Sequence, residues 1–239
     1  MSSPAPAGDS PQSPTLEQRV YDKHRGSVVH LVAERATKEG WKVGSGTGFI
    51  VHNDGTSCLV LTCAHLIKES KRLSVRFGAD RIASARLVHV SEPVDLALLR
   101  VQGASVCTPL EFSDEADLSG KEVVVMGFIG LDKSSICIDP GTSRGHILGE
   151  AVVTRTGSGD LLEFFTTNLS AAKGMSGSPV FLEDNVAGVL FGNDAALINV
   201  LTVASVKAAM KTWARRKQVP EMTIRDMLQV IAEKLSRPN

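Results

Sequence analysis

Three residues far apart in the sequence carry side chains that together can perform acyl transfer. His65 ends the apolar stretch "LVLTCAH", Asp95 heads the apolar run "DLALLRV", and Ser176 lies in "AAKGMSGSPVF". In acyl transfer a serine hydroxyl attacks a carbonyl carbon, an imidazole accepts its proton, and a carboxylate orients the imidazole. Backbone N–H groups stabilise the oxyanion that forms. The three residue types fit the first three of these roles.

Each residue also has an ordinary structural interpretation when it is taken alone. His65 can be a histidine satisfied inside a core, Asp95 can cap a turn, and the stretch around Ser176 can be a plain turn. A carboxylate drawn into the interior is costly unless it is paired, however, and a histidine N–H suits Asp95 as a partner. Gly174 and Gly177 let the backbone turn so that the N–H groups of Gly174 and Ser176 converge on one point.

Short strands must position these residues, because apolar and polar residues alternate with a period of two through most of the chain. The first predicted set covers 27–36, 46–53, 58–62, 72–77, 81–90 and 95–101. The second covers 122–128, 145–155, 161–167, 178–182, 186–192 and 198–204. Two sets of six strands with almost no helix between them indicate an all-β fold, and closed barrels are favoured because closure removes exposed edges. We expect the three residues to meet in the cleft between two barrels.

The chain divides by composition into four parts. Residues 1–14 are rich in Ser, Pro and Ala and are predicted to be disordered. We expect a first barrel with a leading helix over 15–112, a second barrel over 113–205, and a helical extension over 206–239. The apolar positions at helical spacing in this extension are Val206, Ala209, Met210 and Trp213, then Ile224, Met227, Leu228, Ile231 and Leu235. We expect these stripes to pack on the barrels, and a groove for a partner is the alternative.

Charge and cysteine content narrow the class of protein. Lys plus Arg and Asp plus Glu both total 26, so no nucleic-acid partner is expected, although the segment from residue 207 onward is basic. The four cysteines show no spacing typical of disulfide staples: Cys58, Cys63, Cys107 and Cys137. Cys58 and Cys63 lie near His65, but no second pair follows at ligand spacing, so neither a metal nor a cofactor is predicted.

The compartment is predicted from the same cysteines and from the amino end. Few unpaired cysteines favour an intracellular, most simply cytoplasmic, protein. The stretch "MSSPAPAGDSPQSP" has no apolar core of the kind a secretory signal needs, and the chain has no run of 18 apolar residues. We therefore expect no association with a membrane.

Three motifs in a fixed order resemble those of the trypsin/chymotrypsin-like serine proteases: "LTCAHLI", "VDLALLRV" and "GMSGSPVF". The sequence is most similar to the HtrA/Deg-like branch, and the resemblance covers about residues 27–205. It implies two six-stranded antiparallel β-barrels, with short terminal helices outside them, and a serine endopeptidase that works through an acyl-enzyme. It further implies that Ser176 is the nucleophile, His65 the general base and acid, and Asp95 the residue that orients His65. Gly174 and Ser176 would supply the oxyanion hole.

The resemblance also implies how a polypeptide substrate would bind. Ser170 would lie near the base of the specificity pocket, which predicts a small or apolar side chain at the cleavage site. Leu190, Phe191 and Gly192 would form the edge strand that pairs with substrate backbone. A homo-oligomer or a protein partner is expected to use the C-terminal helices.

The chain departs from the family pattern in residues 172–176, which carry the predicted nucleophile and are called the nucleophile loop below. Met175 stands where digestive enzymes have Asp and the HtrA-like branch usually has Asn, and Lys173 stands where that branch usually has Pro. Leu190 replaces the polar residue that supports the triad aspartate in digestive enzymes. No PDZ-like domain is expected in the remaining helical residues. These changes motivate the alternative hypothesis, a protease-fold peptide-binding module whose oxyanion hole is inactive or switchable.

Overall fold

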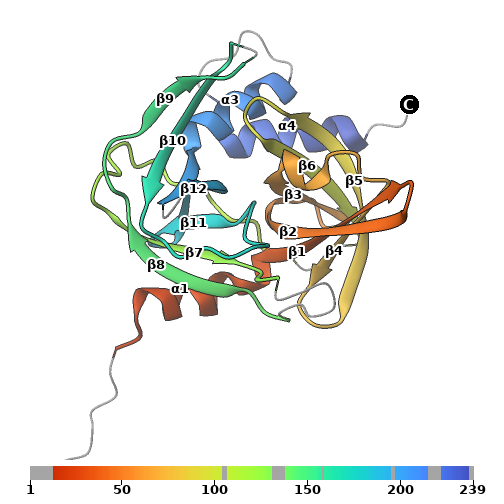
Figure 1. Ribbon diagram of the computed structural model, residues 1–239, viewed down its shortest axis with the longest axis horizontal. Helices are drawn as coiled ribbons and strands as arrows, with labels where there is room; N and C mark the ends of the chain where they lie inside the picture. Colours follow the sequence, from red (N-terminus) through yellow and green to blue (C-terminus); the bar gives the residue numbers. More distant parts are fainter. Residues whose placement is uncertain are drawn as a thin grey trace, which may run out of the picture.

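The computed structural model describes residues 13–103, 107–130, 138–157, 159–194, 197–214 and 222–236, with the backbone alone at 193–194. The segment predicted to be disordered, 1–14, lies outside the described residues except for its last two. Figure 1 shows two β units side by side, with the C-terminal helices above them and the first helix below. The domain limits expected from the sequence stay a prediction.

The first unit is a closed barrel of six antiparallel strands. The strands, in chain order, are β1 (Val28–Thr37), β2 (Gly40–Asn53), β3 (Ser57–Cys63), β4 (Arg72–Phe77), β5 (Arg81–Ser91) and β6 (Leu96–Gln102). Around the barrel the order is β1-β2-β3-β6-β5-β4. Strand β3 is buried along its whole length and pairs with β6 from Ser57 opposite Gln102 to Cys63 opposite Leu96. This pairing brings the end of β3 beside the start of β6, so His65 and Asp95 become neighbours.

The second unit is an antiparallel sheet of seven strands. They are β7 (Glu122–Gly127), β8 (Gly141–His146), β9 (Val152–Arg155), β10 (Leu161–Thr167), β11 (Pro179–Leu182), β12 (Asn185–Asp194) and β13 (Leu197–Thr202). The order is β8-β7-β11-β12-β13-β10-β9, and a bridge between Ile147 and Thr167 draws the β8 and β10 regions together. The all-β fold with two barrel-like units is therefore confirmed, and the second unit has one strand more than expected.

The additional strand arises within the range 145–155, where the sequence pattern predicted a single strand. That prediction is wrong, because β8 ends at His146 and β9 begins at Val152. Strand β8 pairs with β7, whereas β9 pairs with β10, so the chain must change partners between them. The alternation of apolar residues reports the faces of a strand but does not report which neighbour it pairs with.

Helices join the two units at both ends of the chain. Helix α1 (Leu16–His24) begins after Thr15, whose hydroxyl accepts a hydrogen bond from Gln18 N–H, and it contacts β7 and β8. Helix α3 (Val203–Ala214) starts three residues earlier than the predicted extension and packs on β10, β12 and β13. Helix α4 (Ile224–Ser236) packs on β2 and on α3. The expectation that these helices pack on the barrels is confirmed.

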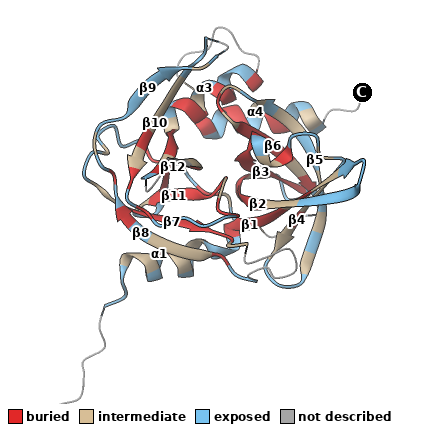
Figure 2. Cartoon of the chain, viewed as in Figure 1, coloured by how far each residue is buried: buried red, intermediate tan, exposed pale blue. Residues whose placement is uncertain are grey.

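One apolar core runs through both units and the helices. It includes Leu61 of β3, Val189 of β12, Trp213 of α3 and Leu228 of α4. In Figure 2 the buried segments lie toward the middle of the molecule and the exposed ones toward its outer edges. Polar anchors reinforce this packing, since Arg100 Nη1 donates to Leu235 O at 2.8 Å and Lys234 Nζ donates to Ala214 O at 2.6 Å. Within the described ranges, no helix has the length and apolar character that a membrane span requires.

A buried histidine on β1 lies where the first unit contacts the second. His30 is 2% exposed, and its ring centroid lies 5.3 Å from that of Phe128. Its Nδ1 has no hydrogen-bond partner in the described part of the chain. Burial, and then the positive charge of Arg76, lower the pKa of His30 from 6.5 to about 4. The native fold therefore holds this imidazole neutral.

We expect the free energy of unfolding to fall by about 2 kcal/mol as pH drops from 6.5 to 4, because only the unfolded imidazole of His30 binds a proton in this window. Above pH 6.5 this penalty is absent. Urea unfolding at several pH values measures how the free energy of unfolding changes with pH. The His30→Gln variant isolates the part due to His30, since burial also lowers the pKa of His24 and His52. Equal slopes for the wild type and the variant would contradict the assignment.

Candidate active site

His65 and Asp95 form a close pair at the open end of the first barrel. His65 lies in the one-turn helix α2 (Ala64–Ile67) that follows β3. Asp95 Oδ2 lies 2.7 Å from His65 Nδ1, and its Oδ1 accepts the His65 backbone N–H at 2.8 Å. The side chain of His65 is 46% exposed and that of Asp95 is 24% exposed. The carboxylate thus holds one ring nitrogen, and nearly half of the His65 side chain remains exposed to solvent.

The backbone of Asp95 is set by its local turn. Its φ is +54°, in the left-handed region, which Asp tolerates better than most residues. The Asp95 N–H donates to Glu92 O at 3.1 Å, and Asp95 O accepts the Ala64 N–H at 3.1 Å. These bonds tie the turn before β6 directly to the residue that precedes His65. Such a conformation persists where surrounding contacts determine it.

The loop that carries Ser176 packs directly against the strands that lead to His65. Thr47 N–H donates to Ser176 O at 2.9 Å, which fixes the backbone of Ser176 against β2. Gly177 has a φ of +83°, and a Cβ there would lie 2.2 Å from Thr47 O and 3.2 Å from Cys63 N. Cys63 is two residues from His65, so the structure brings the third predicted residue to the same end of the barrel. Within the described residues, the Ser176 hydroxyl forms no hydrogen bond with His65.

A hydrogen bond from Gly130 sets the orientation of one peptide group in the nucleophile loop. Lys173 O accepts the Gly130 N–H at 2.8 Å. Because C=O and N–H of a trans peptide point in opposite directions, the Gly174 N–H faces away from Gly130. Across the described ranges, neither Gly174 N–H nor Ser176 N–H donates to a protein acceptor. The role of these two N–H groups as an oxyanion hole stays a prediction.

The buried side chain of Met175 anchors the nucleophile loop to the core of the second unit. Its side chain is 3% exposed and belongs to the core of the second unit, and its Sδ accepts the Ala172 N–H at 3.3 Å. The Met175 N–H donates to Ala172 O at 3.1 Å. An apolar side chain at this position is thus buried beneath the loop, whereas a carboxylate there would need a charged partner.

Thr47 is a residue that the sequence reasoning missed. Its Oγ1 donates to Gly174 O at 2.9 Å and accepts the Phe128 N–H at 2.9 Å. With its backbone bond to Ser176, this fully buried threonine holds the nucleophile loop at two points. The available signal was a hydroxyl residue inside the otherwise apolar stretch "GTGFIV", since buried polar groups are nearly always hydrogen-bonded.

We expect Gly177→Ala to lower the free energy of unfolding by about 3 kcal/mol, because a Cβ meets Thr47 O and the left-handed φ adds strain. The displaced loop should also reduce any turnover. The matched control is Gly120→Ala, which has a φ of +72° but nothing within 4 Å of its Cβ, and which should cost about 1 kcal/mol. Urea denaturation compares the two, and equal losses would show that the close packing of Gly177 contributes nothing.

The residues predicted to bind substrate are spread over the second unit. Ser170 is exposed, and its N–H donates to Ser143 Oγ at 2.9 Å. Leu190 is 4% exposed and faces the core of the second unit, while Phe191 is half-buried against Phe164, with ring centroids 5.9 Å apart. The pairing of β12 with β11 ends at Val189, so Phe191 and Gly192 have no strand partner on that side in the described residues. Their roles stay predictions.

Of the two cysteines that lie near His65 in the sequence, only Cys63 lies beside the His65–Asp95 pair in the structure. The structure gathers Cys63 with His65 and Asp95, their ligand atoms lying within 4.8 Å of one another, and leaves Cys58 in the core of the first barrel. Burial, and then the negative charge of Asp95, raise the pKa of Cys63 well above its usual value. Cys63 is therefore a neutral thiol when no metal ion is bound.

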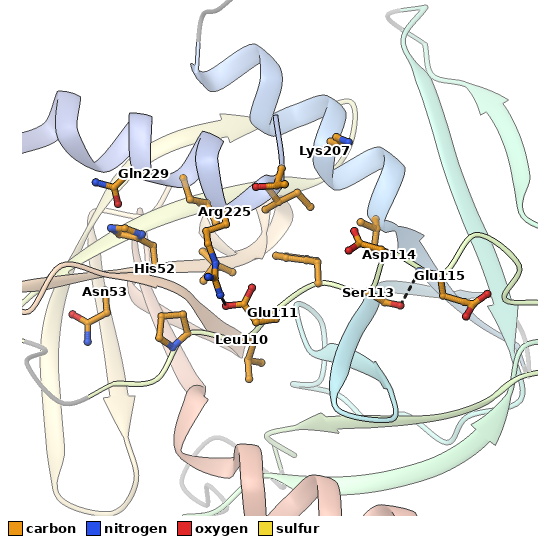
Figure 3. Close-up of a pocket in the computed structure, with 17 residues that line it drawn as sticks. His52, Asn53, Leu110, Glu111, Ser113, Asp114, Glu115, Lys207, Arg225 and Gln229 are labelled. Atoms are coloured by element: carbon orange, nitrogen blue, oxygen red, sulfur yellow. Dashed lines mark hydrogen bonds and ion pairs between the residues drawn. The ribbon is translucent and has the colours of Figure 1, made fainter. Parts of the chain in front are cut away.

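The described residues also form a cavity away from the His65–Asp95 pair. It has a volume of about 920 Å³ and is bounded by the end of β2, the linker 109–115, α3 and the start of α4. Figure 3 shows His52, Asp114 and Lys207 around it, with Arg225 pointing toward Glu111, its ion-pair partner. His65, Asp95 and Ser176 do not line it. Size alone therefore does not identify the site, and the hydrogen-bonded pair beside the nucleophile loop remains the chemical candidate.

Comparisons with known proteins agree with this geometry. The family model described as a trypsin-like peptidase domain matches residues 46–192, which include His65, Asp95 and Ser176. Serine protease HTRA1A of Danio rerio is 29% identical over 177 residues, which are 71% of this chain and 35% of that protein. Mitochondrial serine protease HTRA2 of Bos taurus is 28% identical over 191 residues, or 76% of this chain and 40% of that protein. The chain thus spans about a third of the length of these relatives.

Solved structures of one mycobacterial protease also match. The active form of the Rv3671c protease of M. tuberculosis has a TM-score of 0.68 and 26% identity, covering 93% of this chain and 98% of the other. The inactive form has a TM-score of 0.66 and 27% identity, covering 82% of this chain and 93% of the other. Overall fold similarity therefore does not separate an active from an inactive arrangement of the site. The local contacts of the nucleophile loop must be used for this distinction.

Proposed function

Since the chain belongs to the trypsin-like peptidase domain family, we propose that it is a serine endopeptidase that hydrolyses polypeptides through an acyl-enzyme. The observation that carries the proposal is the orientation of the peptide group between Lys173 and Gly174 in the nucleophile loop. Lys173 O accepts the Gly130 N–H, which turns the Gly174 N–H away from Gly130. Among the described residues, neither this N–H nor that of Ser176 has a protein acceptor. An oxyanion hole needs two such preorganised donors.

The proposed reaction uses each group at a stated atom. Ser176 Oγ attacks the carbonyl carbon of the scissile bond while His65 Nε2 takes its proton. Asp95 keeps the Nδ1 side of the ring occupied by a hydrogen bond, so that Nε2 faces the serine. The N–H groups of Gly174 and Ser176 stabilise the oxyanion, His65 protonates the leaving amine, and water then cleaves the acyl-enzyme with His65 as base.

Substrate backbone would pair with the free side of β12 at Phe191 and Gly192, and Ser170 would line the pocket for the side chain before the cleaved bond. Ser170, the residue that the resemblance places in that pocket, is neutral, so we expect small or apolar side chains to be preferred. The free thiols Cys58, Cys63 and Cys107 support an intracellular compartment. A protein partner or second copy would contact the exposed faces of α3 and α4, because their apolar faces are already buried.

The alternative is a peptide-binding module with an inactive oxyanion hole. Met175 and Lys173 suggest it, because both depart from the family pattern. Burial of Met175 and the bond from Gly130 to Lys173 O favour the enzyme instead. A fluorophosphonate probe distinguishes them, because it reacts only with an activated serine. We expect labelling of the wild type on the peptide that contains Ser176 and none of Ser176→Ala. A folded wild type that stays unlabelled would favour the binding module.

A further inference from the structure

Cys63 occupies the point where the two units meet behind the proposed triad. It is the last residue of β3 and has no exposed surface. Its Sγ lies 3.4 Å from Leu190 O, at hydrogen-bond distance with the sulfur as donor, and this carbonyl oxygen also accepts the Gly177 N–H at 2.8 Å. The same sulfur lies within 4.8 Å of the Asp95 carboxylate. The Cys63 side chain thus contacts the carbonyl oxygen of β12 that also binds Gly177, directly after the nucleophile loop, and it lies close to the Asp95 carboxylate.

Asp95 has room for a further donor. Its Oδ1 accepts the His65 backbone N–H and its Oδ2 faces His65 Nδ1. A carboxylate offers about four lone-pair sites, so two bonds leave it only partly satisfied. The polar side chain that supports this aspartate in digestive enzymes is replaced by Leu190, which has no donor and faces the core of the second unit. The described residues next to the carboxylate offer the Cys63 thiol in its place.

We propose that Cys63 is a positioning residue whose S–H donates to the Asp95 carboxylate and so fixes the orientation of the His65–Asp95 pair. The proposal rests on the endopeptidase function proposed above. Because burial and the charge of Asp95 keep the thiol protonated, the hydrogen is present at all pH values at which the enzyme would work. Leu190 O, the acceptor 3.4 Å from the sulfur, already has the Gly177 N–H. The thiol hydrogen turns about the Cβ–Sγ bond, and a charged acceptor gives the stronger bond, so we assign the S–H to the carboxylate.

A metal held by the same three residues explains the geometry less well. His65 Nδ1 and Asp95 Oδ2 lie 2.7 Å apart, a hydrogen-bond distance. Two ligands of one zinc ion in tetrahedral geometry lie about 3.3 Å apart, given zinc distances of about 2.0 Å. This separation favours a chain of hydrogen bonds from Cys63 through Asp95 to His65.

The first test compares substitutions at two cysteines of the same buried strand. We expect Cys63→Ala to lower kcat about 10-fold with little change in KM, as expected for one hydrogen bond to a charged group. Cys63→Ser, which keeps a donor, should stay within about 3-fold of wild type. The matched control is Cys58→Ala, since Cys58 is equally buried on β3 but belongs to the first barrel core. It should lose stability as Cys63→Ala does and keep kcat.

Three outcomes of that test overturn the proposal. They are an unchanged kcat in Cys63→Ala, a loss in Cys63→Ser as large as in Cys63→Ala, and an equal loss of kcat in Cys58→Ala. The last two would assign the effect to packing in place of hydrogen bonding. Rates are referred to the fraction of protein that the fluorophosphonate probe labels, so misfolded material does not enter.

The second test needs no enzyme activity and therefore separates this proposal from the proposed function. The Raman S–H stretching band of Cys63 is identified as the band lost in Cys63→Ala, and it is then compared between wild type and Asp95→Asn. A thiol that donates to a carboxylate has a lowered stretching frequency, so we expect the Cys63 band to rise in Asp95→Asn while the other thiol bands stay. A Cys63 band that does not move overturns the proposal, even if the protein labels with fluorophosphonate.

Discussion

Ser176→Ala should fold like the wild type and cleave casein about 10⁴-fold more slowly or worse, the loss typical of removing the nucleophile of a triad. The native fold should persist because the contacts of Ser176 are made by its backbone, through the Thr47 N–H that donates to Ser176 O. Within the described residues its hydroxyl has no protein partner, so the substitution leaves no buried group unsatisfied. Initial rates on casein and circular dichroism measure the two quantities.

A surface serine serves as the control for this substitution. Ser84 is exposed on β5, in the first barrel, and Ser84→Ala should leave the rate of casein cleavage unchanged. Cleavage by Ser176→Ala at the wild-type rate would show that the activity comes from another site or from a contaminant.

Asp95→Asn should lower kcat about 10⁴-fold while the fold and substrate binding persist. The structure gives the reason. Asp95 Oδ1 accepts the His65 backbone N–H at 2.8 Å, so the amide oxygen of an asparagine would take this place and its NH₂ group would face His65 Nδ1. Nδ1 must then accept a hydrogen bond, and the ring proton moves to Nε2. An imidazole protonated at Nε2 cannot take the proton of Ser176.

Glu92→Gln is the matched control, because Glu92 is an exposed acid three residues away whose partner is Lys68 at 3.9 Å. It should keep the wild-type kcat. Single-turnover rates with a chromogenic ester would separate chemistry from product release. If Asp95→Asn retained more than about a tenth of kcat, Asp95 would not set the tautomer of His65, and the roles in the triad would need to be reassigned.

Much of the fold and of the candidate site was predictable from local sequence. The period-two pattern placed eleven of the twelve predicted strands at observed strands, because the pattern follows from one buried face on each strand. Strand β2 begins at Gly40, earlier than the predicted start at residue 46. The His65 and Asp95 motifs follow or precede buried strands, and the pairing of β3 with β6 makes them neighbours. The break between β8 and β9 was not predictable, because the choice of pairing partner depends on strands far away in the chain.

By itself, the sequence determined the family, the order of the three candidate catalytic residues and the all-β class, since each rests on short motifs or on strand periodicity. Only the tertiary structure decided how the nucleophile loop is held. The bond from Thr47 to Gly174 joins residues 127 positions apart, and the Gly130 N–H sets the direction of the Lys173 peptide. Such contacts combine residues that carry no joint signal in a single sequence. The burial of Met175 and the place of Cys63 beside Asp95 became visible for the same reason.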